Sequence, residues 1–501
     1  MPKLSLHIEP LEPRLAMDGS VTASLSAGVL AISGTTGEDT ITLSYNASQV
    51  TIVELNQSFL LPGVTSIDVA TGGGDDTVKL HFDSPKKPKW MGVALTIHAN
   101  GGNDRLIDAI DNKYFLGGQE DVLTISRKGD TRLSGQKLTW FDSNVADEAL
   151  REWAEDQYTD KVLSRDDMLA LFEAAGVDQF VTGAEYVSLQ AIAGNRSLFR
   201  KLDHVYALSN YLVGGAPRNP DADVLQLHHL MPGASGLQLE LLVDKWFLGK
   251  SHPDSTDLET GEQYAYRNVA GTLFVNGPTF DDIEQGALGD CYLLAGLAAI
   301  AVHSPEPIEN MFIVNGDGTY TVRFFNGSTP YYVTVDTQLP VDAGGRLIYA
   351  GVGKLHNDPG NELWVSLAEK AYAQFAESGW LDTGGLSVNS YSAINAGWPA
   401  DAMTQVTGKT TIDLLQLDRP SDVVKSFASG RAVTFITLTV PVSLDVIENH
   451  VYALIDYNAQ TREFVLFNPW GLSNPGALSI LNLSWEQAQE NFYSWDFGPK
   501  V

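Results

Sequence analysis

The stretch QGALGDCYLLAGLAAIA, residues 285–301, contains the only cysteine of the 501-residue chain. The glycines of GALGD do not favour a helix, whereas the residues from Cys291 onward do, so Cys291 is predicted to begin a helix. A thiol in that position faces unpaired N–H groups and the positive end of the helix dipole, which favour its thiolate form. Gln285 lies six residues upstream, and its amide together with the N–H of Cys291 can form an oxyanion hole. The pattern predicts a nucleophilic cysteine. The alternative is a buried core cysteine, which gives Gln285 no role.

A thiolate nucleophile requires an imidazole within hydrogen-bonding reach, and the imidazole requires an orienting partner. Of the ten histidines, His450 is the candidate, because it begins the strand pattern of ENHVYALIDYNAQTREFVLFNPWG, residues 448–471. In a hairpin whose turn is NAQT and whose centre is near Ala459, His450 lies opposite Asn468. The sequence therefore predicts a Cys-His-Asn site. A strand histidine with a purely structural role is the alternative for His450.

Five blocks in the second half of the chain resemble, in the same order, segments of the calpain family, the papain-fold cysteine proteases. They are QGALGDCYLLA, VTVDTQLPVDAGGRLIYA (residues 333–350), GNELWVSLAEKAYAQ (residues 360–374), NHVYAL and FNPWG. Together the blocks cover about residues 270–501. The resemblance implies a papain-like catalytic core of two subdomains, residues 270–398 and 399–501, with the active site in the cleft between them.

The resemblance also implies a role for each candidate residue. Cys291 is then the nucleophile, His450 the general base and acid, Asn468 the orienting partner of His450, and Gln285 the oxyanion donor. Trp470 would cover the His–Asn pair and limit the access of water. The expected activity is that of a calpain-like cysteine endopeptidase that hydrolyses peptide bonds in protein or peptide substrates. Interception of the thioester by an amine is a related alternative.

Calcium is the cofactor that the resemblance implies, at one site in each subdomain. Asp282 and Glu362 match the carboxylates of the first site. Asn474 occupies the place where the second site has an acidic residue, so at most one of the two core sites is expected. Tyr292 also replaces the tryptophan that is common after the cysteine, and Asn449 the usual glycine before the histidine; neither change removes a catalytic group.

Residues 21–145 are predicted to form a β-rich region with an irregular repeat of glycines and acids before short strands. The repeat units are GTTGEDTITLSY (34–45), GGGDDTVKLHF (72–82), GGNDRLIDAI (101–110) and GGQEDVLTIS (117–126). Glycines allow tight corners, and each strand can stack on its neighbour. The units resemble the Gly-Asp turns of calcium-binding β-roll proteins; acidic β-turns without a cation are the alternative.

Residues 146–255 follow a helical period. In SRDDMLALFEAAGV, Ser164 is the expected N-cap, with Asp167 three residues later, and Gly176 the expected stop. The preceding residues resemble an EF-hand loop in their acids, but Lys161 stands where that loop needs glycine, so no calcium site is expected there. The pair His228-His229 lacks a third ligand at metal spacing and is interpreted as structural.

The chain as a whole is thus expected to be a multidomain α+β protein with its catalytic core at the C-terminus. It carries 62 acidic and 32 basic side chains, a net charge of −30, which argues against a nucleic-acid partner and favours bound Ca²⁺ or a solvated acidic surface. No apolar run approaches the roughly 20 residues of a membrane span. LEPRLAMDG, in the segment 1–20, resembles a signature of exported or surface proteins of certain bacteria, so export is expected, with a cytoplasmic location as the alternative.

A second function remains open from the sequence: a catalytically silent, calcium-binding surface or adhesion protein whose protease-like module only binds. The acidic repeats of residues 34–126 are what such a protein would carry. No sequence pattern indicates the oligomeric state, the natural substrate or an inhibitory role of residues 1–250.

Overall fold

The structure is a computed structural model of the whole chain. It describes residues 21–46, 48–82, 93–99, 105–108, 122–125, 131–134, 139–177, 179–216, 229–257, 259–381, 387–443, 445–473 and 478–500. The chain divides into two compact units, the first containing residues 1–202 and 231–237, and the second residues 203–230 and 238–501.

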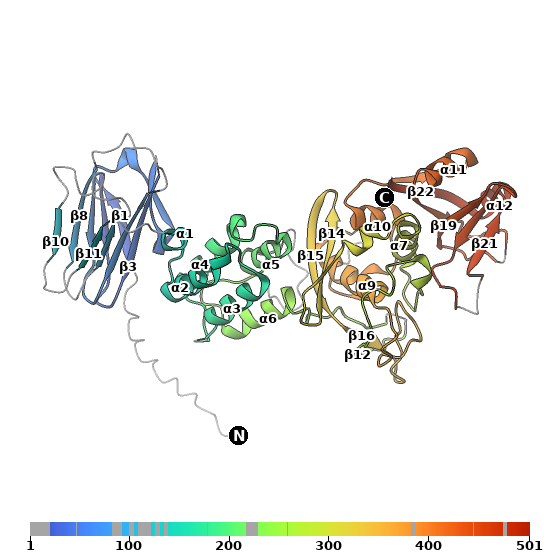
Figure 1. Cartoon of the computed structure of the whole chain (residues 1–501), viewed down its shortest axis with the longest axis horizontal. Helices are drawn as coiled ribbons and strands as arrows, with labels where there is room; N and C mark the ends of the chain where they lie inside the picture. Colours follow the sequence, from blue (N-terminus) through green and yellow to red (C-terminus); the bar gives the residue numbers. More distant parts are fainter. Residues whose placement is uncertain are drawn as a thin grey trace, which may run out of the picture. The chain divides into compact units, whose positions relative to one another are not determined.

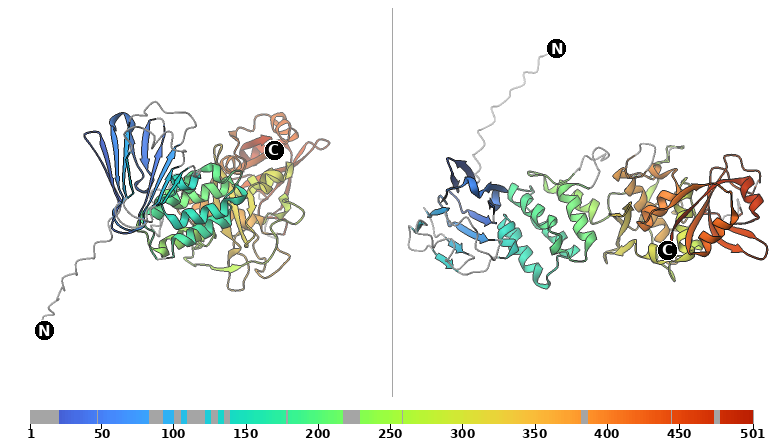
Figure 2. Two further views of the ribbon diagram at one scale, coloured as in Figure 1. Left: turned by 60° about the vertical axis from the view of Figure 1, so that its left-hand side comes forward. Right: turned by 90° about the horizontal axis from the view of Figure 1, so that it is seen from above.

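The first unit begins with strands that form two sheets (blue in Figures 1 and 2). The strands are β1 (Thr22–Ser26), β2 (Val29–Ser33), β3 (Thr40–Tyr45), β4 (Gln49–Ile52), β5 (Gln57–Leu60), β6 (Ser66–Ala70), β7 (Thr77–Phe82), β8 (Ala94–Ala99), β9 (Arg105–Asp108), β10 (Val122–Ile125) and β11 (Thr131–Ser134). One sheet has the order β1-β2-β6-β8-β10 and the other β11-β9-β7-β3-β4-β5.

The chain alternates between the two sheets from β6 to β11, so the strands build a parallel coil. Within one sheet β2, β6, β8 and β10 pair in parallel, and within the other β3, β7, β9 and β11 do the same. Alternate residues of these strands point inward and form an apolar core that includes Leu30, Ile32, Ile41, Leu43 and Val69. The predicted stacking of the short strands of the repeat is confirmed for the units 34–45 and 72–82, whose strands β3 and β7 are neighbours.

The turns that precede β3 and β7 also stack on each other. The N–H of Gly73 donates to the carbonyl of Thr35 (3.0 Å), and the N–H of Asp39 donates to Oδ1 of Asp76 (2.9 Å). Gly72 has a φ of 97°, and a Cβ atom there would lie 1.8 Å from the carbonyl oxygen of Thr35, so only glycine fits. The corresponding turns of the units 101–110 and 117–126 lie outside the described residues.

The helices that follow in the first unit are α1 (Trp140–Asn144), α2 (Glu148–Gln157), α3 (Arg165–Ala175) and α4 (Gly183–Gly194). The predicted start and end of the third helix are confirmed. Ser164 and Asp167 form a reciprocal capping box, and Gly176 is the C-cap. His228 lies outside the described residues.

The second unit contains the rest of the helices and strands. Its helices are α5 (Asp203–Gly214), α6 (Gly236–Trp246, from Gln238 onward), α7 (Cys291–His303), α8 (Glu306–Glu309), α9 (Trp364–Phe375), α10 (Pro399–Thr407), α11 (Pro420–Ala428) and α12 (Trp485–Asn491). Its strands are β12 (Ala265–Asn268), β13 (Phe312–Val314), β14 (Thr319–Asn326), β15 (Thr329–Asp336), β16 (Gln338–Val341), β17 (Ile412–Leu415), β18 (Arg431–Thr437), β19 (Val451–Asn458), β20 (Glu463–Phe467), β21 (Ile480–Leu483) and β22 (Phe492–Lys500).

An antiparallel sheet of order β17-β22-β18-β19-β20-β21 forms the C-terminal part of this unit. Its core includes Val433, Phe435, Tyr452, Leu454 and Phe464. The mostly apolar helix α7 packs against β18, β19 and α10, and Figure 1 shows it beside α10 and β19. The cysteine at the start of α7 is thereby held against the sheet that carries the predicted histidine.

Buried ion pairs connect the remaining elements of the second unit. The ammonium group of Lys245, at the end of α6, pairs with the carboxylate of Glu377 just after α9, and both side chains are buried. Next to Lys245, the carbonyl of Trp246 accepts a hydrogen bond from Oγ1 of Thr334 in β15 (2.7 Å). These contacts make α6 part of the same folded body as α9 and β15.

Candidate active site

Cys291 is the first residue of α7, as predicted, and its side chain is 9% exposed. The preceding turn lies against a second backbone segment. The N–H of Ala287 donates to the carbonyl of Ile348 (3.0 Å), and a Cβ atom on Gly286 would lie 2.1 Å from that carbonyl oxygen. Gly286 is therefore required by close backbone packing, which fixes the path of the turn that leads into the helix.

The predicted hairpin is present, but its predicted register is wrong. Ala453 pairs with Phe467 and Asn458 with Glu463, so His450 and Asn468 are not directly opposite in the ladder. The four-residue loop is AQTR, residues 459–462, rather than NAQT, because Asn458 still pairs with Glu463 and the turn ends at Arg462, whose φ of 63° is left-handed. A register shift between Leu454 and Asp456 moves the pairing by one residue but does not restore the predicted alignment.

His450 and Asn468 nevertheless meet, because each lies immediately outside its strand at the open end of the hairpin. Nε2 of His450 and Oδ1 of Asn468 are 2.9 Å apart, and both residues are buried. Oδ1 of Asn468 also accepts from the N–H of Trp470 (3.1 Å), which fixes the orientation of the amide. Since Oδ1 only accepts, Nε2 carries the proton of the neutral imidazole, and Nδ1 is left with the lone pair.

The thiol of Cys291 lies beside the residue that follows the histidine, where the N–H of Val451 donates to sulfur. In the described residues no hydrogen bond joins the sulfur to the imidazole of His450. The predicted lowering of the thiol pKa is wrong for this arrangement. Burial, reinforced by the charge of Asp290, raises the pKa of Cys291 to about 12. Burial likewise lowers the pKa of His450 to about 4, so the structure holds a neutral thiol and a neutral imidazole.

Gln285 is buried between the cysteine turn and the segment that carries Asn468. Its N–H donates to the carbonyl of Pro469 (2.8 Å), and Nε2 donates one hydrogen to the carbonyl of Leu288 (2.7 Å). The second hydrogen of Nε2 remains for another acceptor, as the predicted oxyanion role requires. The backbone bond to Pro469 links the two halves of the site.

Aromatic side chains enclose the imidazole of His450. The ring of Trp470 lies 5.3 Å from it, tilted by 58°, and the ring of Tyr452 lies 5.3 Å from it, edge-on. Trp470 is where the sequence places it. Tyr452 is a residue that sequence reasoning missed, although it is two residues after His450 and so shares its face of the strand. Its hydroxyl accepts from the N–H of Ile447 (3.1 Å) and steadies the loop before the histidine.

The two predicted calcium ligands are brought together. The carboxyl groups of Asp282 and Glu362 are in side-chain contact, and burial together with the charge of Asp282 raises the pKa of Glu362 to about 7. Oδ2 of Asp282 accepts from Nε1 of Trp364 (3.0 Å), and Oε1 of Glu362 from the N–H of Val275 (2.6 Å). Across the described residues, no group of three or more His, Cys, Asp or Glu side chains is arranged to hold a metal. Asn474 lies outside the described residues.

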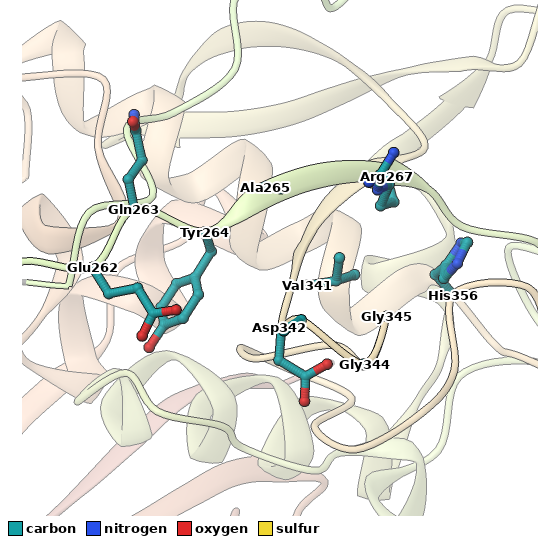
Figure 3. Close-up of a pocket in the computed structure, with 11 residues that line it drawn as sticks. Glu262, Gln263, Tyr264, Ala265, Arg267, Val341, Asp342, Gly344, Gly345 and His356 are labelled. Carbon is teal, nitrogen blue, oxygen red and sulfur yellow. The ribbon is translucent and has the colours of Figure 1, made fainter.

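A polar pocket of about 540 Å³ lies elsewhere in the second unit, between β12 and the loop after β16. Figure 3 shows Glu262 and Tyr264 on one side of it, Arg267 and His356 on the other, and the carboxylate of Asp342 between them. Cys291, His450 and Asn468 do not line this pocket, so it is separate from the candidate active site.

The comparisons with known proteins concern the same part of the chain. Residues 264–493 match the family model of the calpain family cysteine proteases. A calpain of Schistosoma mansoni is 27% identical over 248 residues, which cover 44% of this chain and 30% of the relative. The rat calpain-1 catalytic subunit is 28% identical over 256 residues (45% and 31%), and a calpain-type cysteine protease of Arabidopsis thaliana is 32% identical over 195 residues (38% and 8%). The matched part thus spans less than a third of these relatives' own length. In the part of the chain that the structure describes, no helix has both the length and the apolar composition needed to cross a membrane.

Proposed function

Because residues 264–493 of this chain are a calpain family cysteine protease domain, we propose that the protein is a cysteine endopeptidase in which Cys291, His450 and Asn468 are the catalytic triad. The observation that carries this proposal is the 2.9 Å contact between Nε2 of His450 and Oδ1 of Asn468, next to the strand residue whose N–H donates to the thiol. Cysteine, histidine and asparagine side chains can act together in nucleophilic catalysis. Here the three residues are distant in sequence, and all lie near one end of β19.

The tautomer of His450 assigns the proton transfers. Nε2–H donates to Asn468, so Nδ1 is the atom that accepts the thiol proton of Cys291. The thiolate then attacks the peptide carbonyl, and Nδ1–H protonates the departing amine. Water, deprotonated by the same nitrogen, hydrolyses the thioester. The N–H of Cys291 and the free hydrogen of Gln285 Nε2 would stabilise the oxyanion.

Formation of the reactive thiolate–imidazolium pair by Cys291 and His450 requires both side chains to be better solvated than they are in the structure. A thiol pKa of about 12 and an imidazole pKa of about 4 both follow from burial, and each disfavours the charged form. We expect the active form to expose the side chains of Cys291 and His450 to water or substrate. The same burial is the observation that favours the silent binding module as the second candidate.

Asp282 and Glu362 fit one half of a calcium site, since two adjacent carboxylates supply the hard oxygen ligands that Ca²⁺ prefers. Both side chains retain an oxygen that makes no backbone or indole bond. Bound Ca²⁺ would neutralise the repulsion between them, and backbone carbonyls or water would complete the coordination. Calcium dependence is therefore part of the proposal. Export also remains a proposal, because residues 1–20 lie outside the described residues.

The test is labelling of the full-length protein with a thiol-directed peptidyl inhibitor, together with hydrolysis of casein, each with Ca²⁺ and with chelator. We expect labelling at Cys291 and casein cleavage, both lost in Cys291→Ala and in His450→Ala. His356→Ala, which changes a histidine of the separate polar pocket, is the matched control and should keep both. A folded wild-type protein that shows neither labelling nor cleavage under any condition would favour the binding module.

A further inference from the structure

Asp290 immediately precedes the nucleophile, but its side chain does not cap the helix that starts there. It occupies the N-cap position of α7, where an aspartate ordinarily accepts an N–H of the first turn, and it makes no such bond. The side chain is instead fully buried (0% exposed). A carboxyl group that is buried without an N-cap hydrogen bond requires another polar partner in the protein interior.

That partner is Glu369 of α9, itself 1% exposed. The two carboxyl groups are in hydrogen-bonding contact. Oε2 of Glu369 accepts from the N–H of Ala350 (3.0 Å), but Oε1 of Glu369 and both oxygens of Asp290 receive no hydrogen from any other group in the described residues. Two carboxylates cannot satisfy each other, whereas a carboxylic acid can donate to a carboxylate.

In the described residues no Lys, Arg or His side chain forms an ion pair with either carboxyl. Lys370, the neighbour of Glu369 on α9, points elsewhere and binds Oδ1 of Asp336 and the carbonyl of Gln338 (2.8 Å). The titratable groups that face the pair are a thiol and four phenols: Cys291, Tyr292, Tyr349, Tyr372 and Tyr391. Burial raises the pKa of each, so they stay neutral near pH 7.

We propose that Asp290 and Glu369 share a proton and that this contact positions the turn from which Cys291 is presented, which makes both acids positioning residues. Glu369 is the centre of the arrangement, because it joins α9, the segment at Ala350 and the cysteine turn. That segment is the one on which the turn rests, since Ala287 donates to Ile348 and Gly351 donates to Glu284 (2.7 Å).

The direction of the proton equilibrium agrees with this geometry. Burial raises the pKa of Asp290 to about 7, and burial together with the charge of Asp290 raises that of Glu369 well above its usual range. A carboxyl whose pKa is raised by folding stabilises the fold fully below its unfolded pKa, near 4, and this stabilisation is lost as the pH rises through the folded value. Loss of the last proton leaves two buried charges side by side, which should push the turn and the nucleophile out of place.

The first measurement does not depend on catalysis and compares the pH dependence of unfolding in wild type, Glu369→Gln and Asp290→Asn. Each variant replaces one acid by an amide that donates permanently. Relative to wild type, the folded-to-unfolded ratio of each should rise by about tenfold per pH unit above pH 5, because one proton fewer is taken up on folding. Asp336→Asn is the control: the hydrogen bond from His252 and the charge of Lys370 lower the pKa of Asp336, so its carboxyl is ionised in both folded and unfolded states above pH 5 and its loss removes no proton uptake there.

The second measurement rests on the proposed function and follows peptide turnover against pH. Glu369→Ala should lower kcat at least tenfold with little change in KM, Glu369→Gln should restore it, and both amide variants should keep turnover at alkaline pH where wild type loses it. Equal pH slopes of unfolding in wild type and both amide variants would overturn the shared proton. If the slopes differ as expected but the alkaline loss of turnover is unchanged, the positioning role is overturned. If wild type has no turnover but the slopes differ, the proposed function fails and the proton pair stands.

Discussion

His450 and Asn468 lie one residue outside the paired strands β19 and β20, and the 2.9 Å contact between their side chains closes the open end of that hairpin. The backbones of the two residues are held by other partners: the carbonyl of His450 accepts from the N–H of Thr437 (2.9 Å), and the N–H of Asn468 donates to the carbonyl of Ser479 (2.9 Å). The side-chain contact gives the imidazole one fixed neighbour and leaves its Nδ1 for the thiol.

Removing the side chain of Asn468 should lower kcat more than it weakens substrate binding. In Asn468→Ala the imidazole loses its acceptor and can rotate, so we expect kcat to fall on the order of 10²-fold with KM within a few-fold of wild type. Peptide turnover with a circular dichroism control for folding measures this. An unchanged kcat in a folded variant would remove Asn468 from the proposed triad.

Replacing the amide by a carboxylate should instead shift a pH profile. In Asn468→Asp the negative charge would stabilise the imidazolium of His450 and raise its pKa from the low value that burial imposes. The acidic limb of turnover, and the pH at which the imidazole protonates by NMR, should both move upward. Movement in the other direction would show that the two groups do not interact in solution.

Buried His450 should also make stability depend on pH. Its pKa falls from 6.5 in the unfolded chain to about 4 in the folded protein, so its contribution is complete above about pH 6.5 and is lost as the pH falls to about 4. The free energy of unfolding of wild type relative to His450→Ala should therefore decrease by about 3 kcal/mol across that range. Denaturant unfolding at several pH values tests this, and a constant difference between pH 4 and 7 would contradict the burial of the imidazole.

The candidate calcium pair can be tested without any assay of activity. Titration calorimetry of the full-length protein with Ca²⁺ should show a site that Glu362→Gln and Asp282→Asn each weaken at least tenfold. Asp358→Asn, which changes a loop carboxylate that only caps its own turn, is the matched control and should leave the isotherm unchanged. Equal isotherms in all four proteins would place calcium elsewhere.

The stacked turns of the first unit should tolerate no side chain at Gly72. Gly72→Ala places a Cβ atom 1.8 Å from the carbonyl oxygen of Thr35 at a φ of 97°, so we expect the first unit to lose about 2 kcal/mol or more. Gly63→Ala is the matched control, since nothing lies within 4 Å of its Cβ position. Thermal unfolding of both variants compares them, and equal midpoints would show that the turns do not stack.

Local patterns were sufficient for several parts of this fold. The start of α7 at Cys291, the N-cap Ser164 with Asp167 three residues later, and the stacking of the repeat strands all depend on patterns of residues close together in sequence. The predicted hairpin register is wrong because the loop is shifted by one residue, from NAQT to AQTR, and ends at the left-handed residue Arg462, which no turn motif signals.

Tertiary burial accounts for what sequence could not predict at the site. The helix dipole predicts a low thiol pKa, but the side chains packed around Cys291 remove the water that a thiolate needs. The contact between Asp290 and Glu369, 79 positions apart in the numbering, requires α9 to be docked before it exists. Neither effect can be inferred from the spacing of residues along the chain.

The ion pair of Lys245 with Glu377 has a practical consequence for anyone who wishes to excise the protease. The family match begins at residue 264, yet Lys245 lies upstream of it and neutralises a carboxylate buried just after α9. A fragment that begins at residue 264 would leave the carboxylate of Glu377 buried without its ammonium partner and would lack the backbone carbonyl of Trp246 to which Thr334 donates. Cloning boundaries for the isolated calpain-like domain belong before α5, where the second unit begins, rather than at residue 264.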